Sequence, residues 1–225
     1  MARATLVKSA QSDIYSRGKR VEYVSQKGKR EGQTLSKIDR TQPFDENDTV
    51  LIHKGEPYYW WQFLNGGKNI SKTQPRQSQL TQSEFMSQYY SIQEQIEDMA
   101  ITTAEELSEF VESLKSDAET LRDETQEKLD SMPDSLQSSP TGELLQERID
   151  EMEEIVSQLE NIEVEYEEDM DDINTDVASD NDIDTDVEGW ETELSEEDVE
   201  AKKEEKLQEF IDEKVEEIKE ISFNL

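Results

Sequence analysis

The chain has 225 residues, of which 36% are charged and 32% are hydrophobic, and its formal net charge is -34. A chain so rich in charge does not fill one large hydrophobic core, so its length favours one domain with an extension or two small domains. The absence of cysteine excludes disulfides and thiolate metal sites, and the single histidine, His53, excludes a metal site with two histidine ligands.

The charge is distributed unevenly along the chain. Residues 1–80 contain 14 Lys and Arg against 8 Asp and Glu, a net charge of +6, whereas residues 81–225 contain 9 against 49, a net charge of -40. One interpretation is a basic part that binds nucleic acid and an acidic part that mimics nucleic acid or binds basic proteins. The other interpretation is that the two parts neutralise each other, within one chain or between chains.

The first forty residues are basic and contain short apolar runs at 14–15 and 21–24, which are expected to form strands. A cationic run, Lys27-Gly28-Lys29-Arg30, follows them. Its three cations are candidate phosphate contacts, namely Lys27, Lys29 and Arg30. The alternative interpretation is that the run forms the solvated tip of a hairpin.

The stretch from Lys54 to Phe85, KGEPYYWWQFLNGGKNISKTQPRQSQLTQSEF, begins with a dense aromatic block. Aromatic residues favour strands, and the pair Gly66-Gly67 predicts a two-residue hairpin turn after the block. A single hairpin is marginally stable in water, so residues 49–53 are expected to add a third strand beside it.

This turn would place Trp61 opposite Lys72 in the hairpin. Alternation along the strands then gives a candidate binding surface of aromatic and basic side chains, formed by Tyr59, Trp61, Phe63, Lys68 and Lys72. One hypothesis is that Tyr59 and Trp61 form a stacking platform for single-stranded nucleic acid. The favoured interpretation is that the aromatic face is a small core, because apolar material is scarce in a domain of this size.

The string KGEPYYWWQF-x-x-GGK-x-x-SKT-x-P-x-x-SQLTQSEF resembles a family of small, uncharacterised proteins of tailed bacteriophages. Those proteins open with a Val-Lys-Lys-Ala-Arg-Lys-Asp-like segment, which Val7 to Ile14 matches in part. They continue with a Tyr-Tyr-Trp-Trp-Lys-Phe block, where this chain has Gln62 in place of the basic residue. Here roughly forty residues separate the two blocks, and the resemblance covers about a fifth of the chain. It implies a viral origin and an intracellular setting, and it implies no function.

From Thr81 onward the spacing of apolar residues becomes helical. Thr81 with Glu84, and Thr102 with Glu105, have the capping-box spacing of helix starts, and a shift of the apolar positions predicts a break near residues 101–102. The clearest apolar positions recur at intervals of four and three and form a helical seam: Leu107, Val111, Leu114, Leu145, Ile149, Met152, Val156 and Leu159. An acidic helical hairpin is therefore expected in 81–162, and a coiled-coil oligomer is the competing arrangement.

Residues 163–194 are rich in Asp and poor in apolar residues, which predicts a disordered acidic linker. Ser195 and Asp198 then mark the start of an amphipathic helix in 195–225, which would dock back on the hairpin or bind a partner. The alternating aspartates of the linker fit no EF-hand register, so neither a metal nor another cofactor is expected.

The sequence contains no P-loop, dinucleotide fingerprint or nucleophile elbow, so no catalytic residue is predicted. No apolar run is long enough to cross a bilayer, and we expect a protein of the host-cell cytoplasm without membrane contact.

The predicted fold class is α+β, a small antiparallel β-module followed by an acidic helical hairpin or coiled-coil tail. The predicted function is that of a non-enzymatic, phage-encoded accessory protein that binds a host or phage macromolecule through its β-module and acidic helices. Its partner is expected to be a protein, with nucleic-acid binding through residues 1–80 as a second hypothesis. The alternative is a virion or assembly component that forms a homo-oligomer through its helical seams.

Overall fold

The computed structural model describes residues 1–64, 66–186 and 189–225. It contains helices and small antiparallel sheets, so the α+β fold class is confirmed. The chain divides into two compact units, which we call the β-module (Met1–Ser87) and the helical unit (Gln88–Leu225). None of the helices in the described ranges is both long and apolar enough to span a membrane.

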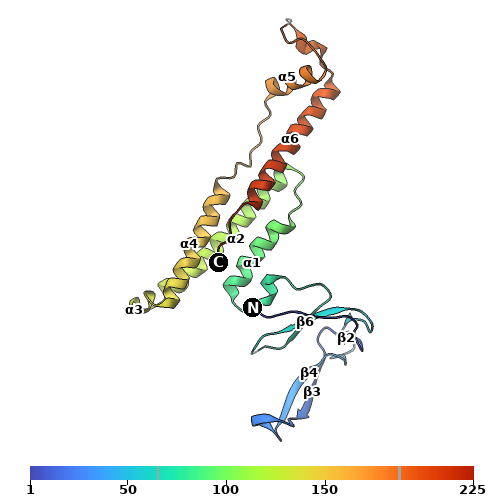
Figure 1. Ribbon diagram of the computed structural model, residues 1–225, viewed down its shortest axis with the longest axis vertical. Helices are drawn as coiled ribbons and strands as arrows, with labels where there is room; N and C mark the ends of the chain where they lie inside the picture. The colour runs from blue at the N-terminus through green and yellow to red at the C-terminus, as the bar shows by residue number, and fades with distance from the viewer. Residues whose placement is uncertain (65, 187–188) are drawn as a thin grey trace. The chain divides into compact units, whose positions relative to one another are not determined.

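The β-module contains three small antiparallel sheets (Figure 1). The largest has the order β1-β6-β7, with β1 at Thr5–Val7, β6 at Tyr58–Gln62 and β7 at Lys68–Ser71. Each of the other two sheets is a pair of strands: β2 (Ile14–Tyr15) with β5 (Val50–Ile52), and β3 (Lys19–Val24) with β4 (Thr34–Asp39). Two short 3-10 helices, η1 and η2, occupy Gly28–Arg30 and Gln77–Leu80.

The prediction that residues 49–53 pair with the aromatic hairpin is wrong. Residues 50–52 form β5 and pair with β2, and β1 takes the position next to β6. The reason is the small core of the module, in which Ile52 is fully buried against Ala10 and Ile14. Backbone bonds from Ala10 N to Glu56 O (2.8 Å) and from Gly55 N to Ala10 O (2.9 Å) hold β5 at this core.

The predicted register of the aromatic hairpin is also wrong. Trp61 pairs with Asn69 and not with Lys72, so a longer loop replaces the two-residue turn. Neither Gly66 nor Gly67 has the positive φ that a primed turn requires. Because side chains alternate along a strand, this shift of three residues changes which side chains of β6 and β7 share a face.

Within the described residues, three long helices and the shorter helices beside them form the helical unit. The helices are α1 (Glu84–Asp98), α2 (Ala104–Asp130), α3 (Asp134–Gln137), α4 (Pro140–Glu160), α5 (Met170–Asp180) and α6 (Glu196–Lys219), with the 3-10 helix η3 at Trp190–Glu193. The break predicted near residues 101–102 is present between α1 and α2. Helices α2 and α4 pack along each other, and seven of the eight predicted seam residues are buried, with Leu145 half-buried.

The predicted disordered linker at 163–194 is wrong over part of its length, because residues 170–180 form α5. Ile173, Val177 and Ala178 lie on one face of α5 and are buried. Lysines of α6 pair with the surrounding carboxylates: Lys206 with Asp172 and Asp176, Lys202 with Asp180, and Lys203 with Glu168. The buried apolar face and these ion pairs with α6 compensate for the low helix propensity of the aspartates on which the prediction of disorder rested. Val187 and Glu188 of the predicted linker lie outside the described residues.

Helix α6 packs back onto the helical unit, where it contacts α5 and α2, and its Ile211 and Ile218 are buried. The residues that follow α6 reach a buried polar pair, in which the Tyr89 hydroxyl donates to the Glu151 carboxylate at 2.7 Å. Asn224 N donates to the same carboxylate oxygen (2.6 Å), and Leu225 N donates to the Tyr89 hydroxyl (3.2 Å). Burial raises the pKa of the Tyr89 hydroxyl above its ordinary value, and the bond to Glu151 raises it further.

Candidate nucleic-acid interface

The five residues of the predicted aromatic surface do not form one surface. Trp61 is 7% exposed, and its indole N–H donates to the Gln79 carbonyl at 3.1 Å, so it is part of the interior of the β-module. Lys72 lies 3.5 Å from the Glu56 carboxylate in an ion pair. A stacking platform that includes Trp61 is therefore excluded in this fold.

Lys68 lies with the other aromatic face of β6. It pairs across the strands with Gln62, and its ammonium group lies 4.3 Å from the centroid of the half-buried Trp60 ring. A cation at this distance from an indole face is attracted by the ring quadrupole. The predicted place of Lys68 on the face of Trp61 is wrong, because it depends on the wrong hairpin register.

A cleft of about 840 Å³ lies in the β-module, beside this face of β6. Three cations line it: Lys37 from β4, Arg40 from the residues just after β4, and Lys68 from β7. The other residues that line the cleft are uncharged: Val7, Ser9, Gln11, Ser12, Ile14, Ser36, Ile38, Thr41, Tyr58, Gln62, Gly66, Gly67 and Ile70. This volume is within the range of about 300–1,000 Å³ typical of ligand sites.

The positive charge of this cleft is only partly offset by nearby carboxylates. No carboxylate is among its described lining residues, and its three cations form no ion pair within the described part of the chain. Asp39, the acidic residue nearest in sequence, is engaged by Thr41, whose hydroxyl (2.7 Å) and backbone N–H (3.0 Å) donate to its carboxylate. The hydroxyl bond, followed by the backbone bond, lowers the pKa of Asp39 below its ordinary value, and the charge of Lys37 lowers it further, so Asp39 offsets part of the charge of Lys37.

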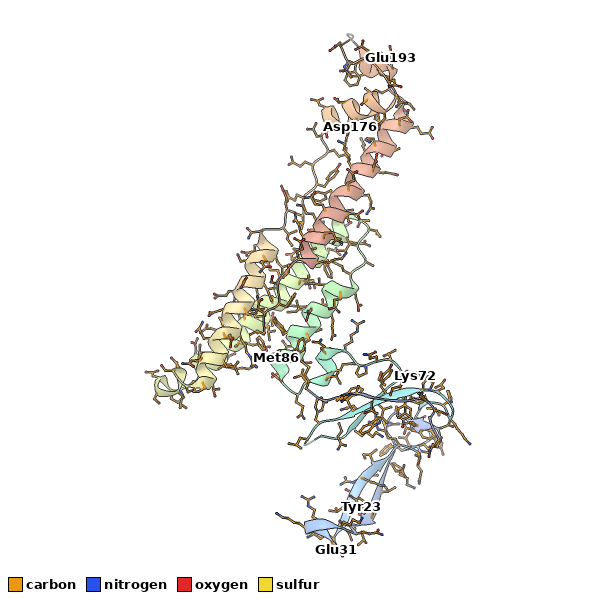
Figure 2. All side chains as sticks on the ribbon, in the orientation of Figure 1. Tyr23, Glu31, Lys72, Met86, Asp176 and Glu193 are labelled. Carbon is orange, nitrogen blue, oxygen red and sulfur yellow. The ribbon has the colours of Figure 1, made fainter. Side chains whose placement is uncertain are left out.

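The hairpin of β3 and β4, which we call the β-arm (residues 19–39), extends away from the other strands of the module (Figure 1). Most of its residues are exposed. All three candidate phosphate contacts, Lys27, Lys29 and Arg30, are exposed in the loop at its tip, where Glu31 also lies (Figure 2). Gly28 in this loop has φ +81°, a conformation that glycine adopts without strain.

A buried carboxylate fixes the base of the β-arm. Asp48, whose side chain is fully inaccessible to solvent, accepts four hydrogen bonds, from Ser16 Oγ (2.7 Å), Gly18 N (2.9 Å), Phe44 N (2.9 Å) and Arg17 N (3.0 Å). Gly18 has φ +70°, and a Cβ there would come within 2.8 Å of the Cα of Arg40. Glycine is therefore required at the point where the chain enters the arm.

The hydrogen bonds to Asp48 also determine its ionisation. Burial alone would raise the pKa of this carboxyl, but the bonds from the three backbone N–H groups and the serine hydroxyl outweigh burial and lower the pKa well below its ordinary value of 3.8. Asp48 is therefore a fixed anion that organises the loops on both sides of the arm. This role of Asp48 was not predicted from the sequence, because its four donors lie up to 32 residues away.

A comparison of the chain with protein-family models, curated proteins and solved structures found no match. Within the described ranges, no group of three or more His, Cys, Asp or Glu side chains is arranged to hold a metal ion. The interpretation of the cleft and the β-arm therefore depends on their own charge, shape and exposure.

Proposed function

We propose that this protein is a non-enzymatic binding protein whose β-module binds nucleic acid. The observation that carries the proposal is the cleft, with Lys37, Arg40 and Lys68 on its walls and no carboxylate among its described lining residues. Cations that form no ion pair with the protein favour an anionic ligand, and phosphate groups are the ligands that Lys and Arg commonly hold. The exposed cations at the tip of the β-arm extend the same charge beyond the cleft.

Nucleic acid fits this cleft better than an isolated anion does. Its walls combine the three cations with hydroxyl and amide side chains and with Tyr58 and aliphatic residues, so phosphate, sugar and base each find suitable contacts. The strongly acidic helical unit opposes this binding at long range. Salt weakens that repulsion beyond a Debye length of about 8 Å, and contacts inside the cleft are shorter than this distance.

The proposed origin is a bacteriophage, in agreement with the family that the aromatic block resembles. We place the protein among accessory binding proteins rather than virion components because the seam residues are already used within one chain. Leu107, Leu114 and Met152 are completely buried in the helical unit. An assembly component that oligomerised through a coiled coil of these residues would have to separate α2 from α4 first.

The test is a salt titration of nucleic-acid binding by the full chain, measured by fluorescence anisotropy with a labelled DNA single strand and a labelled DNA duplex. The double variant Lys37→Gln/Arg40→Gln removes two cleft cations. Each phosphate contact contributes about one unit to the slope of log affinity against log salt, so the slope should fall by about two. The expected loss is the same for different base sequences.

The matched control is Arg3→Gln/Lys54→Gln, which removes two exposed cations of the β-module that do not line the cleft. Its slope should stay within about half a unit of that of the unaltered chain. The proposal is overturned if the unaltered chain binds neither DNA, or if the control and the cleft variant lose affinity equally.

A further inference from the structure

The β-arm has the shape of a ribbon that is solvated on both faces. Its strands are six residues each and pair in register from Lys19 with Asp39 to Val24 with Thr34. At about 3.3 Å per residue, each strand spans roughly 20 Å. No other strand of the described chain pairs with β3 or β4, and two strands alone are marginally stable in water.

We propose that the β-arm enters the major groove of double-stranded DNA, while the cleft at its base holds phosphates of the flanking backbone. This inference rests on the proposed function and specifies the ligand. The major groove of B-form DNA is about 12 Å wide and about 8.5 Å deep and admits a two-stranded β-ribbon. The arm is connected to the cleft because β4 supplies Lys37 and is followed by Arg40.

One face of the arm has side chains suited to base edges. The register places Arg20, Glu22 and Val24 of β3 on the same face as Ile38, Ser36 and Thr34 of β4. Arginine binds the N7 and O6 acceptors of guanine, hydroxyls bind several base edges, and aliphatic groups contact the thymine methyl. Arg20 Nη2 lies 2.9 Å from Ser36 Oγ, so the guanidinium is held along the ribbon rather than folded against another element.

Two exposed aliphatic residues support this interpretation. Val24 is 57% exposed and Ile38 is 55% exposed, both on the face that carries Arg20. Solvent-exposed aliphatic residues on an unsupported ribbon contribute little to its stability, whereas contact with thymine methyl groups would remove them from water.

Charge decides in favour of DNA over a protein that would add a strand to the edge of the ribbon. Residues 19–40 contain seven Lys and Arg against three Asp and Glu, and three of these cations are exposed at the tip. Strand addition depends on backbone hydrogen bonds and does not require a cationic tip. When a ribbon lies in the major groove, cations at its tip can contact the phosphates that border the groove on both sides.

The arm is less suited to single strands, whose successive bases stack on several exposed aromatic rings. Its one aromatic residue, Tyr23, is 43% exposed but is a single ring, with the Lys37 ammonium 5.6 Å from its centroid, on the face opposite Arg20. Double-stranded RNA is excluded by its deep, narrow major groove, which side chains do not enter. The arm therefore favours duplex DNA over single strands and over duplex RNA, whereas the cations of the cleft would attract all three.

The decisive variant replaces residues 24–34 by Asn-Gly. Tyr23 and Leu35 are direct cross-strand partners, so a two-residue turn joins them without changing the register, and the cleft cations are retained. The full chain and this variant are titrated with a DNA duplex, a DNA single strand and an RNA duplex of the same sequence. Duplex DNA affinity should fall at least about tenfold, and single-strand affinity should fall less, because the single strand loses only the attraction of the tip cations.

A second variant, Lys27→Gln/Lys29→Gln/Arg30→Gln, keeps the whole ribbon and removes only the tip cations. It should lose up to about three units of the salt slope for duplex DNA. Methylation of guanine N7, which lies in the major groove, should block binding of the unaltered chain to the duplex.

The inference is overturned if the shortened arm binds the duplex as well as the unaltered chain does, or if N7 methylation has no effect. In either case single-strand binding that depends on Lys37 and Arg40 would still support the proposed function. If the unaltered chain binds no nucleic acid at all, the proposed function and this inference both fail.

Discussion

The two units of this protein are stabilised in different ways. In the helical unit, apolar residues recur at helical spacing and are buried along whole helices, as with Leu107, Leu114 and Leu121 of α2. In the β-module, the identified core cluster is small, and one carboxylate, Asp48, accepts four hydrogen bonds from two segments of the chain. The helical unit therefore depends on many interchangeable contacts, and the β-module depends on a few specific ones.

This difference indicates where each unit is most sensitive to substitution. Apolar contacts are non-directional, so a seam tolerates exchange among residues of similar volume at small cost. Hydrogen bonds to a buried anion are directional, and loss of the acceptor leaves its donors without partners. A single polar substitution in the β-module should therefore have a larger effect than a single apolar truncation in the helical unit.

The largest expected effect is that of Asp48→Ala, which should abolish cooperative folding of the β-module and leave the helical unit folded. Trp61 would become exposed to solvent, and the helical circular-dichroism signal would persist. Tryptophan emission in a Trp190→Phe background, which leaves Trp60 and Trp61 of the β-module, and circular dichroism measure the two outcomes separately. The control is Asp45→Ala, which removes an exposed carboxylate paired with Arg17 and should leave emission unchanged. Equal effects of the two substitutions would contradict the role assigned to Asp48.

The same carboxylate predicts a dependence on pH. The pKa of Asp48 is lowered in the folded chain, so its stabilising contribution is complete above the ordinary value of 3.8 and is lost as the pH falls below that value. The tryptophan signal of the unaltered chain should therefore show acid unfolding of the β-module at pH values below 3.8. In Asp48→Asn, any β-module that remains folded should lose most of this acid dependence. If the unaltered chain and Asp48→Asn unfold at the same acidic pH, carboxylates other than Asp48 cause the pH dependence.

The second effect in size is that of Leu114→Ala in the helical unit. Leu114 is completely buried in α2, so its truncation leaves a cavity and should reduce the free energy of unfolding of this unit by about 2–5 kcal/mol. Denaturant unfolding followed by the helical circular-dichroism signal measures the change. Leu144→Ala is the matched control, because Leu144 is 42% exposed and should change the stability by less than about 1 kcal/mol. Emission of Trp61 should be unaffected by either substitution.

The smallest effect is that of Tyr89→Phe, which tests whether the helical unit also has a directional contact. The substitution removes the hydroxyl that donates to the buried Glu151 carboxylate and should cost about 1–3 kcal/mol. Tyr166→Phe is the control, since the hydroxyl of Tyr166 has no hydrogen bond within the described residues. A loss no larger than that of the control would show that water replaces the hydroxyl. Hydrogen exchange at Asn224 and Leu225 reports the contact directly.

The helical unit was largely predictable from the sequence because its signals are local. The break between α1 and α2 follows from the shift of the apolar spacing, and the start of α6 follows from Ser195, whose hydroxyl accepts from Glu197 N. Helix α5 was not predictable in this way. Its aspartates favour disorder when considered alone, and the lysines that pair with them, Lys202 and Lys206, come more than twenty residues later.

The candidate interface was predictable only in part, because its residues are brought together by pairing between distant segments. The cationic tip of the β-arm was identified from a local run, and Lys68 was identified but assigned to the wrong face. Lys37 and Arg40 were missed, because nothing near them in the sequence indicates that they meet Lys68 across a cleft. The register error had the same origin: the Gly66-Gly67 pair is a local turn signal, and the burial of Trp61 is a tertiary requirement.

The arrangement around Asp48 also has a consequence for how such a module diverges during evolution. Apolar residues of a small core are readily exchanged for one another. Gly18 is not, because any other residue there would have a strained positive φ and a Cβ too close to Arg40. The lasting signature of the module would therefore be Ser-Arg-Gly at 16–18 followed by Asp about thirty residues later. Distant relatives should be recognisable by this sparse polar pattern after their hydrophobic and aromatic residues have changed.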